Sequence, residues 1–124
     1  MATFNLTSAI LDSSIKDNDI LFIDFWASWC GPCRAFGPVF EKASDTHSDI
    51  AFAKCNTEES SDVAMTFGVS SIPTLAIFRE GILLYANPGA LPEKALEDLI
   101  QQVKALDMEK IKSEIEEKSQ SSQA

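Results

Sequence analysis

The order of apolar and polar positions divides this chain of 124 residues into alternating strands and helices. Nearly continuous apolar, β-favouring runs are typical of buried strands, whereas apolar residues every three or four positions indicate helices. The strands expected from this pattern cover residues 4–6, 20–26, 50–56, 74–79 and 82–86, and the helices cover 8–15, 32–47, 58–67 and 92–106. The alternation predicts an α/β fold with a central mixed sheet of about five strands and helices on both faces.

Glycine and proline mark several of the boundaries. Pro32 suits the first turn of a helix, whereas Pro38 lies inside the same helix and should kink it. Gly68 is expected to stop the third helix. Glu80-Gly81 predicts a tight hairpin between the last two strands, and Pro88-Gly89 predicts a loop after them.

The last part of the chain differs in composition from the rest. Residues 1–106 are expected to form one domain, whereas residues 107–124 are a charged extension that is helical or disordered. The extension has Met108, Ile111 and Ile115 as its only large apolar residues. We interpret it as a solvated segment. The alternative is a docking segment that binds a partner through these three side chains.

The composition excludes several classes of protein. A net charge of -9 argues against nucleic acid and anionic membranes as partners. The apolar runs are far too short to span a membrane. The first basic residue is Lys16, and no long apolar run precedes it, so we expect no export signal and a cytoplasmic location. We expect a monomer.

Cys30-Gly31-Pro32-Cys33 lies at the joint between a predicted buried strand and a predicted helix. Such a pair in an alternating strand–helix chain indicates a redox dithiol. Cys30 is placed at the helix N-terminus, which favours its thiolate form, so we expect Cys30 to be the nucleophile. We expect Cys33 to be the resolving thiol and the more buried of the two. The alternatives are an inert pair or half of a zinc site. Zinc needs about four ligands, and we expect no metal.

Asp24 is the odd residue in an otherwise apolar strand. Burial should raise the pKa of its carboxyl group, which could then pass a proton to or from the resolving thiol. The alternative is a solvated residue at the edge of a strand. Cys55 is expected to be a small buried apolar residue on the opposite face of the sheet from Lys54. We expect His47 to be solvated at a helix end and assign it no function.

Five segments, in order along the chain, resemble the thioredoxin family over roughly residues 4–106. They are Ile23-Asp24-Phe25-Trp26-Ala27, Trp29-Cys30-Gly31-Pro32-Cys33, Ala53-Lys54, Ser71-Ile72-Pro73-Thr74 and Pro88-Gly89-Ala90-Leu91. The resemblance implies a thioredoxin fold and a protein-disulfide reductase that an NADPH-dependent thioredoxin reductase recycles. It implies no cofactor beyond the redox-active disulfide Cys30–Cys33, and disulfide-containing proteins as substrates.

The resemblance also implies roles for individual residues. Lys54 would modulate the charge on Asp24, although strand-end lysines are often plain surface residues. Pro73 would follow a cis peptide bond and leave the backbone of Ile72 free to pair with a substrate, although a trans proline can also open a strand. The substrate-binding rim around Cys30 would then consist of Trp29, Gly31, Pro32, Ile72, Pro73, Gly89 and Ala90.

Two other functions compete with a reductase. The first is a binding module, such as a subunit, chaperone or redox-sensitive regulator, which would use the same face. Its function would survive loss of the cysteines. The second is an oxidase or isomerase. The Gly-Pro dipeptide between the cysteines resembles the reducing members of the family, so we favour a reductase that carries electrons to protein disulfides.

Overall fold

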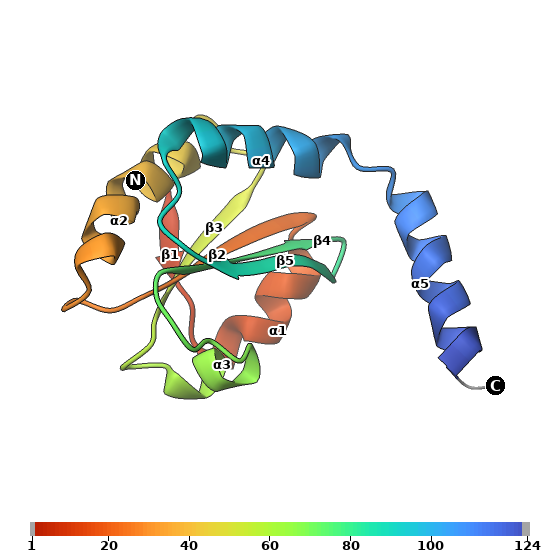
Figure 1. Cartoon of the computed structure of the whole chain (residues 1–124), viewed down its shortest axis with the longest axis horizontal. Helices are drawn as coiled ribbons and strands as arrows, with labels where there is room; N and C mark the ends of the chain where they lie inside the picture. Colours follow the sequence, from red (N-terminus) through yellow and green to blue (C-terminus); the bar gives the residue numbers. More distant parts are fainter. Residues whose placement is uncertain (1, 123–124) are drawn as a thin grey trace.

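One five-stranded sheet with helices on both faces forms the body of the molecule (Figure 1). The structure is a computed structural model, which describes residues 2–122 and the side chains of residues 2–119. Residue 1, at the start of the expected domain, and residues 123 and 124, at the end of the expected extension, lie outside the described residues. The strands are β1 (Thr3–Asn5), β2 (Ile20–Trp26), β3 (Ala51–Asn56), β4 (Thr74–Arg79) and β5 (Ile82–Pro88). The helices are α1 (Ser8–Asp17), α2 (Gly31–Thr46), α3 (Ser61–Thr66), α4 (Glu93–Ala105) and α5 (Met108–Ser122).

The strand order is β1-β3-β2-β4-β5, which confirms the mixed sheet. β1, β3 and β2 are parallel, as their helical crossovers require, whereas β4 is antiparallel to both β2 and β5. The hairpin between β4 and β5 turns at Glu80 and Gly81, whose φ angles of 52° and 79° are both positive. Two positive φ angles are typical of the tight hairpin turn that the sequence predicts.

Alternation along β2 divides the core into two layers. Ile20 and Phe22 pack against α2 and α4, whereas Leu21, Ile23 and Phe25 pack toward α1 and α3. Successive side chains of a strand point to opposite faces, so Asp24 lies on the face that α2 and α4 cover. Figure 1 shows these two helices above the sheet and α1 and α3 below it. The side chain of Asp24 on β2 therefore lies beneath α2.

Some element boundaries differ from the prediction. α3 begins at Ser61 rather than near residue 58, because the Asn56 side-chain oxygen accepts the N–H groups of Glu58 and Glu59 at 2.9 and 3.4 Å and holds a turn there. β5 continues through Pro88, which pairs with Thr74, so the expected loop starts one residue later. α2 is one helix that runs through Pro38, as expected.

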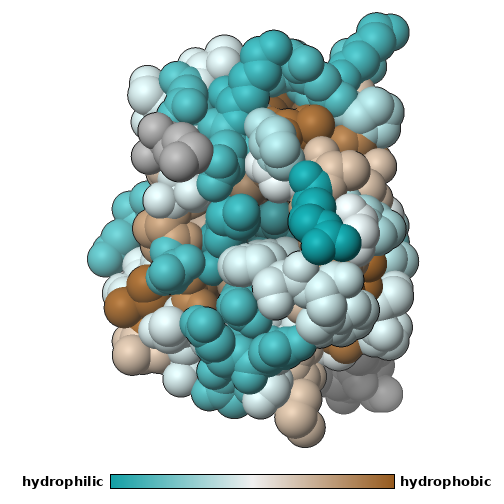
Figure 2. All heavy atoms as spheres, turned by 90° about the vertical axis from the view of Figure 1, so that its left-hand side faces the viewer, coloured by the Kyte–Doolittle hydropathy of each residue, from teal (hydrophilic) through white to brown (hydrophobic). Residues whose placement is uncertain are grey.

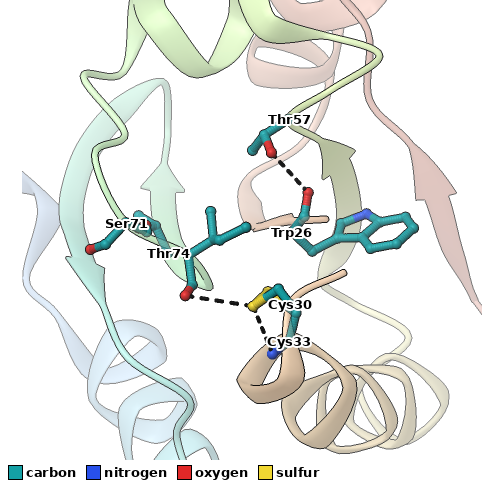
Figure 3. Close-up of a disulfide and its surroundings, with 7 residues drawn as sticks. Trp26, Cys30, Cys33, Thr57, Ser71 and Thr74 are labelled. Atoms are coloured by element: carbon teal, nitrogen blue, oxygen red, sulfur yellow. Dashed lines mark hydrogen bonds between the residues drawn. A yellow bond between two sulfur atoms is a disulfide. The ribbon is translucent and has the colours of Figure 1, made fainter. Parts of the chain in front are cut away.

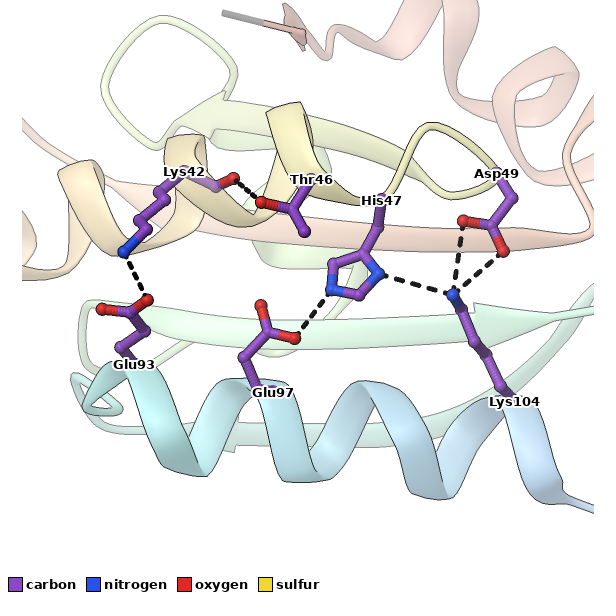
Figure 4. Close-up of polar contacts among 7 residues, drawn as sticks. All are labelled: Lys42, Thr46, His47, Asp49, Glu93, Glu97 and Lys104. Carbon is purple, nitrogen blue, oxygen red and sulfur yellow. Dashed lines mark hydrogen bonds and ion pairs between the residues drawn. The ribbon is translucent and has the colours of Figure 1, made fainter.

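The prediction that His47 is solvated was wrong. Only 9% of the residue is exposed, and its ring bridges the end of α2 and the face of α4 (Figure 4). Nε2 lies 2.7 Å from a carboxylate oxygen of Glu97, and Nδ1 lies 3.4 Å from Nζ of Lys104. An ammonium group only donates, so Nδ1 accepts and Nε2 donates to Glu97. Lys104 also forms an ion pair with Asp49 at 3.0 Å.

The C-terminal extension forms a separate helix rather than a continuation of α4. At its start, the Asp107 carboxylate accepts the N–H group of Lys110 at 3.2 Å, as a helix N-cap does. Met108 is buried, and Lys112 forms an ion pair with Glu80 at 2.6 Å. α5 therefore attaches near the turn of the β4–β5 hairpin, at the side of the molecule (Figure 1).

Candidate active site

The two cysteines lie where β2 leads into α2. The N–H group of Cys30 donates to Ala27 at 3.2 Å, which turns the chain out of the strand, and Pro32 lies in the first turn of the helix. Cys30 is the N-cap of α2, and its sulfur accepts the N–H group of Cys33 at 3.2 Å (Figure 3). The two sulfur atoms are joined in a disulfide, with Cα atoms 5.2 Å apart. The predicted position of Cys30 at a helix N-terminus is confirmed.

This position stabilises negative charge on the Cys30 sulfur. The unpaired N–H groups and the dipole at a helix N-terminus both favour a thiolate over a thiol. The two residues are equally buried as a whole, since each cysteine is 4% exposed. What separates them is the surface next to them, since Cys30 lines a groove and Cys33 does not.

The start of β4 lies opposite the dithiol. The peptide bond between Ile72 and Pro73 is cis, as the resemblance implied. The carbonyl oxygen of Ile72 lies 3.7 Å from the Cys30 sulfur, and the carbonyl oxygen of Pro73 accepts the N–H group of Gly89 at 2.8 Å. Segments 42 residues apart along the chain thus meet at Cys30.

An open groove with a volume of about 490 Å³ runs beside Cys30. Of the predicted rim, Trp29, Gly31, Pro32 and Ile72 line it, and Trp29 is 66% exposed. Pro73 is buried, and Gly89 and Ala90 are exposed but do not line this groove. The remaining lining residues, which sequence reasoning missed as site residues, are Thr57, Ala64, Val69, Ser70 and Ser71. Only Ser71 had a signal, because it belongs to a segment that carries the resemblance.

The surface on this side of the molecule is mixed in character. Figure 2 shows polar residues over much of it and apolar residues in separate small patches. A surface of this kind suits contact with many protein segments better than contact with one large apolar partner.

Asp24 is buried behind α2, as predicted. The residue is 1% exposed, and neither carboxylate oxygen has a hydrogen-bond partner among the described residues. The pKa of Asp24 is raised to about 7. Burial is the main cause, Lys54 opposes it by lowering the pKa, and Glu41 adds to the rise. A carboxyl group with this pKa exchanges protons at neutral pH.

Lys54 is the basic residue nearest in register to this acid. It pairs with Asp24 between the parallel strands β2 and β3. Its ammonium group lies 5.0 Å from the centre of the Trp26 ring and 3.6 Å from a carboxylate oxygen of Glu41. Sequence reasoning missed Glu41, although its place on the predicted helix 32–47 was a weak signal.

Comparison with known proteins agrees with this geometry. The family model for thioredoxin matches residues 2–102, which is most of the chain. The chain belongs to the thioredoxin family. A relative from Streptomyces coelicolor, "Putative thioredoxin 2", is 48% identical over 116 residues, covering 94% of this chain and 87% of that protein. A thioredoxin from Mycoplasma pneumoniae is 40% identical, covering 74% of this chain and 90% of its own length.

Solved structures show the same thioredoxin fold. A mutant thioredoxin from Halobacterium salinarum superposes with a TM-score of 0.77 at 35% identity, covering 84% of this chain and 92% of the other. Mitochondrial thioredoxin 3 from Saccharomyces cerevisiae, in its oxidized form, has a TM-score of 0.74 at 37% identity, with 81% and 94% covered.

The chain is thus a thioredoxin-type thiol-disulfide oxidoreductase whose redox group is its own disulfide. Within residues 2–122, no group of three or more potential ligands is placed to hold a metal ion. The third cysteine, Cys55, is free and fully buried in the core layer that faces α1 and α3. Burial raises the pKa of its thiol to about 11, with further contributions from Asp62 and Asp24, so it is a poor nucleophile.

Proposed function

We propose that Cys30 is the nucleophile and Cys33 the resolving thiol of this thioredoxin. In the reduced protein, the Cys30 thiolate attacks one sulfur of a target disulfide. A bond forms between Cys30 and that sulfur, and the other target sulfur leaves as a thiolate that takes up a proton. Cys33 then loses its proton and attacks the Cys30 sulfur. The Cys30–Cys33 disulfide forms, the second target sulfur leaves, and two electrons have passed to the target.

The observation that carries this assignment is the position of Cys30. Its sulfur accepts a backbone N–H group at the start of α2 and borders the groove, whereas Cys33 does not line the groove. The attacking sulfur must meet the target first, and the resolving sulfur needs only to reach its partner three residues away. The geometry supports this division of roles.

We assign Asp24 as the group that takes the proton from Cys33 and returns it. A base for this step must be unprotonated often enough at neutral pH to accept a proton, and a pKa of about 7 satisfies that condition. Asp24 lies on the face of the sheet that α2 covers, and α2 carries Cys33 in its first turn. Lys54 modulates the charge on Asp24.

The substrates we propose are extended segments of disulfide-containing proteins. The proposed rim comprises Trp29, Gly31, Pro32 and Ile72, which line the groove, together with the buried Pro73 and the exposed Gly89 and Ala90. Its apolar, largely uncharged character supports contact through the target backbone rather than through particular side chains. Such a rim would accept many targets.

We propose that an NADPH-dependent thioredoxin reductase restores the dithiol and that the protein carries electrons as a monomer in the cytoplasm. A reductant needs a continuous supply of electrons, and reducing compartments provide it. None of the helices within residues 2–122 has the length and apolar character to cross a membrane. We further propose that the thioredoxin unit ends near residue 106.

The test is NADPH oxidation in a mixture of thioredoxin reductase, insulin and the protein. We expect rapid turnover by the wild type and none by Cys30→Ser, because serine cannot form the mixed disulfide. Cys55→Ala is the matched control, since it removes a cysteine from the opposite core layer, and it should keep the wild-type rate.

A third variant tests the division of roles. Cys33→Ser should form a mixed disulfide with insulin. Non-reducing electrophoresis should show it as a separate band, which disappears when dithiothreitol reduces the bond. Turnover by Cys30→Ser near the wild-type rate would reject Cys30 as the nucleophile. Absence of a trapped species with Cys33→Ser would reject Cys33 as the resolving thiol.

A further inference from the structure

The ammonium group of Lys54 is confined between α2 and Trp26. Its side chain is 20% exposed, and that of Glu41, its ion-pair partner at 3.6 Å, is 27% exposed. The Trp26 ring covers it from another side at 5.0 Å. A cation between a carboxylate and an aromatic face is held by both charge and ring electrons.

The ammonium group of Lys54 lies beside α2 at Gly37 and Glu41. Gly37 and Glu41 are four residues apart and therefore lie on one face of the helix. A Cβ atom on Gly37 would lie 3.8 Å from Nζ of Lys54, in ordinary van der Waals contact, so the ammonium lies next to this part of the helix. The ammonium thus lies against α2, although its strand position is in register with Asp24.

Asp24 gains no hydrogen bond from this lysine. Both of its carboxylate oxygens lack hydrogen-bond partners among the described residues. The charged groups that act on Asp24 are Lys54 on β3 and Glu41 on α2, and Asp24 in turn raises the pKa of Cys55 on β3. On β4, the pairing partner of Asp24 is the uncharged Leu75. Lys54 lowers the pKa of Asp24 and Glu41 raises it.

We propose that Glu41 is a positioning residue for the buried acid: it holds the Lys54 ammonium against α2, out of hydrogen-bonding reach of Asp24, and so leaves Asp24 free to take up and release a proton during turnover. Without Glu41, the ammonium would lean toward the carboxylate of Asp24. The Lys54 ammonium therefore forms its ion pair with Glu41 and acts on Asp24 only through its charge. The link to turnover rests on the proton-transfer role proposed above for Asp24.

The experiment is a ¹³C NMR titration of the Asp24 carboxyl carbon in the oxidised protein. The disulfide keeps Cys30 and Cys33 from titrating, so the midpoint reports on Asp24 itself. Glu41→Gln should lower this midpoint by roughly half a pH unit or more. Glu93→Gln is the control, because it removes the same charge from an exposed ion pair with Lys42 and should leave the midpoint unchanged.

A double-mutant cycle with Lys54→Met tests whether Glu41 acts through the lysine. In the Lys54→Met background, the shift caused by Glu41→Gln should fall to half or less of its value in the wild type. Equal shifts in both backgrounds would overturn the proposal, because Glu41 would then act by direct repulsion alone. No shift in either background would overturn it as well.

The titration and the kinetics test separately the positioning role of Glu41 and the proton-transfer role of Asp24. If Asp24 exchanges the Cys33 proton, the pH–rate profile of insulin reduction loses one limb in Asp24→Asn, and Glu41→Gln moves that limb to lower pH. A limb that persists in Asp24→Asn would reject the proton-transfer role of Asp24. The NMR midpoints would still decide whether Glu41 positions Lys54.

Discussion

At the scale of one residue, the burial of Asp24 opposes the stability of the fold at neutral pH. An ordinary aspartate is ionised at neutral pH, but burial raises the pKa of this one to about 7, from 3.8 in an unfolded chain. Between these two values the folded protein binds a proton that the unfolded chain has released. Stability must therefore fall as the pH rises through this window and remain reduced above it.

We predict that Asp24→Asn stabilises the protein at pH 8 by about 2–4 kcal/mol, because a neutral amide avoids the cost of a buried charge. The gain should shrink as the pH falls and nearly vanish below pH ~4, where Asp24 is protonated in both states. Urea unfolding at several pH values measures this, with Asp12→Asn on the exposed side of α1 as the control. A gain independent of pH would contradict burial of the charge as its cause.

Single residues were predictable where the signal is local. Cys30 and Asp24 stand out because their neighbours along the chain reveal a helix start and a buried strand. His47 and Glu41 do not stand out, since what matters for each is a partner on a different helix or strand. The carboxylate that faces His47 is 50 residues away, and the lysine that meets Glu41 lies on another element.

At the scale of an element, the end of α4 depends on a side chain from the sheet. Nη1 of Arg79, in the last position of β4, donates to the carbonyl oxygens of Val103, Lys104 and Leu106 at 2.7, 3.2 and 3.1 Å. The last carbonyl groups of a helix have no partner within it. Arg79 supplies that partner and fastens α4 to the hairpin.

We predict that Arg79→Met destabilises the fold by about 1–3 kcal/mol, because it leaves these half-buried carbonyl groups without a charged donor. Arg34→Met is the matched control, since Arg34 is exposed on α2 and should change stability little. Thermal unfolding of both variants measures the difference. Equal losses would mean that the contact contributes nothing specific.

Elements were predictable from hydrophobic periodicity, and errors occurred where a side chain altered the backbone. The apolar runs gave β2 and β4 to the residue, because both strands are covered on both faces. The start of α3 was misplaced because the Asn56 side chain holds a turn ahead of it. No periodic pattern records such a contact.

At the scale of the whole molecule, α5 lies beside the thioredoxin body. The Streptomyces relative covers 94% of this chain, so its similarity runs into α5, whereas the family model ends at residue 102. The helix is tied on by the buried side chain of Met108 and by the ion pair between Lys112 and Glu80. The ion pair lies at the turn of the β4–β5 hairpin, at the opposite side of the molecule from the start of α2 (Figure 1).

We predict that a chain ending at Leu106 reduces insulin at the wild-type rate but is less stable by about 1–3 kcal/mol. Most of the loss comes from the burial of Met108, because an exposed ion pair contributes little. Met108→Ala in the full chain should reproduce most of it. Insulin turnover and urea unfolding measure the two effects. A slow truncated chain with a normal unfolding midpoint would show that α5 acts in catalysis.

The disulfide joins residues only three positions apart, from the N-cap of α2 to its first turn. A ring this small restricts little of the chain, because the entropy that a crosslink removes grows with the loop it closes. We therefore expect the oxidised and reduced proteins to have nearly the same shape. A reductase and a target would then have to recognise one common surface, and only the sulfur chemistry would tell them whether the protein is ready to accept electrons or to give them.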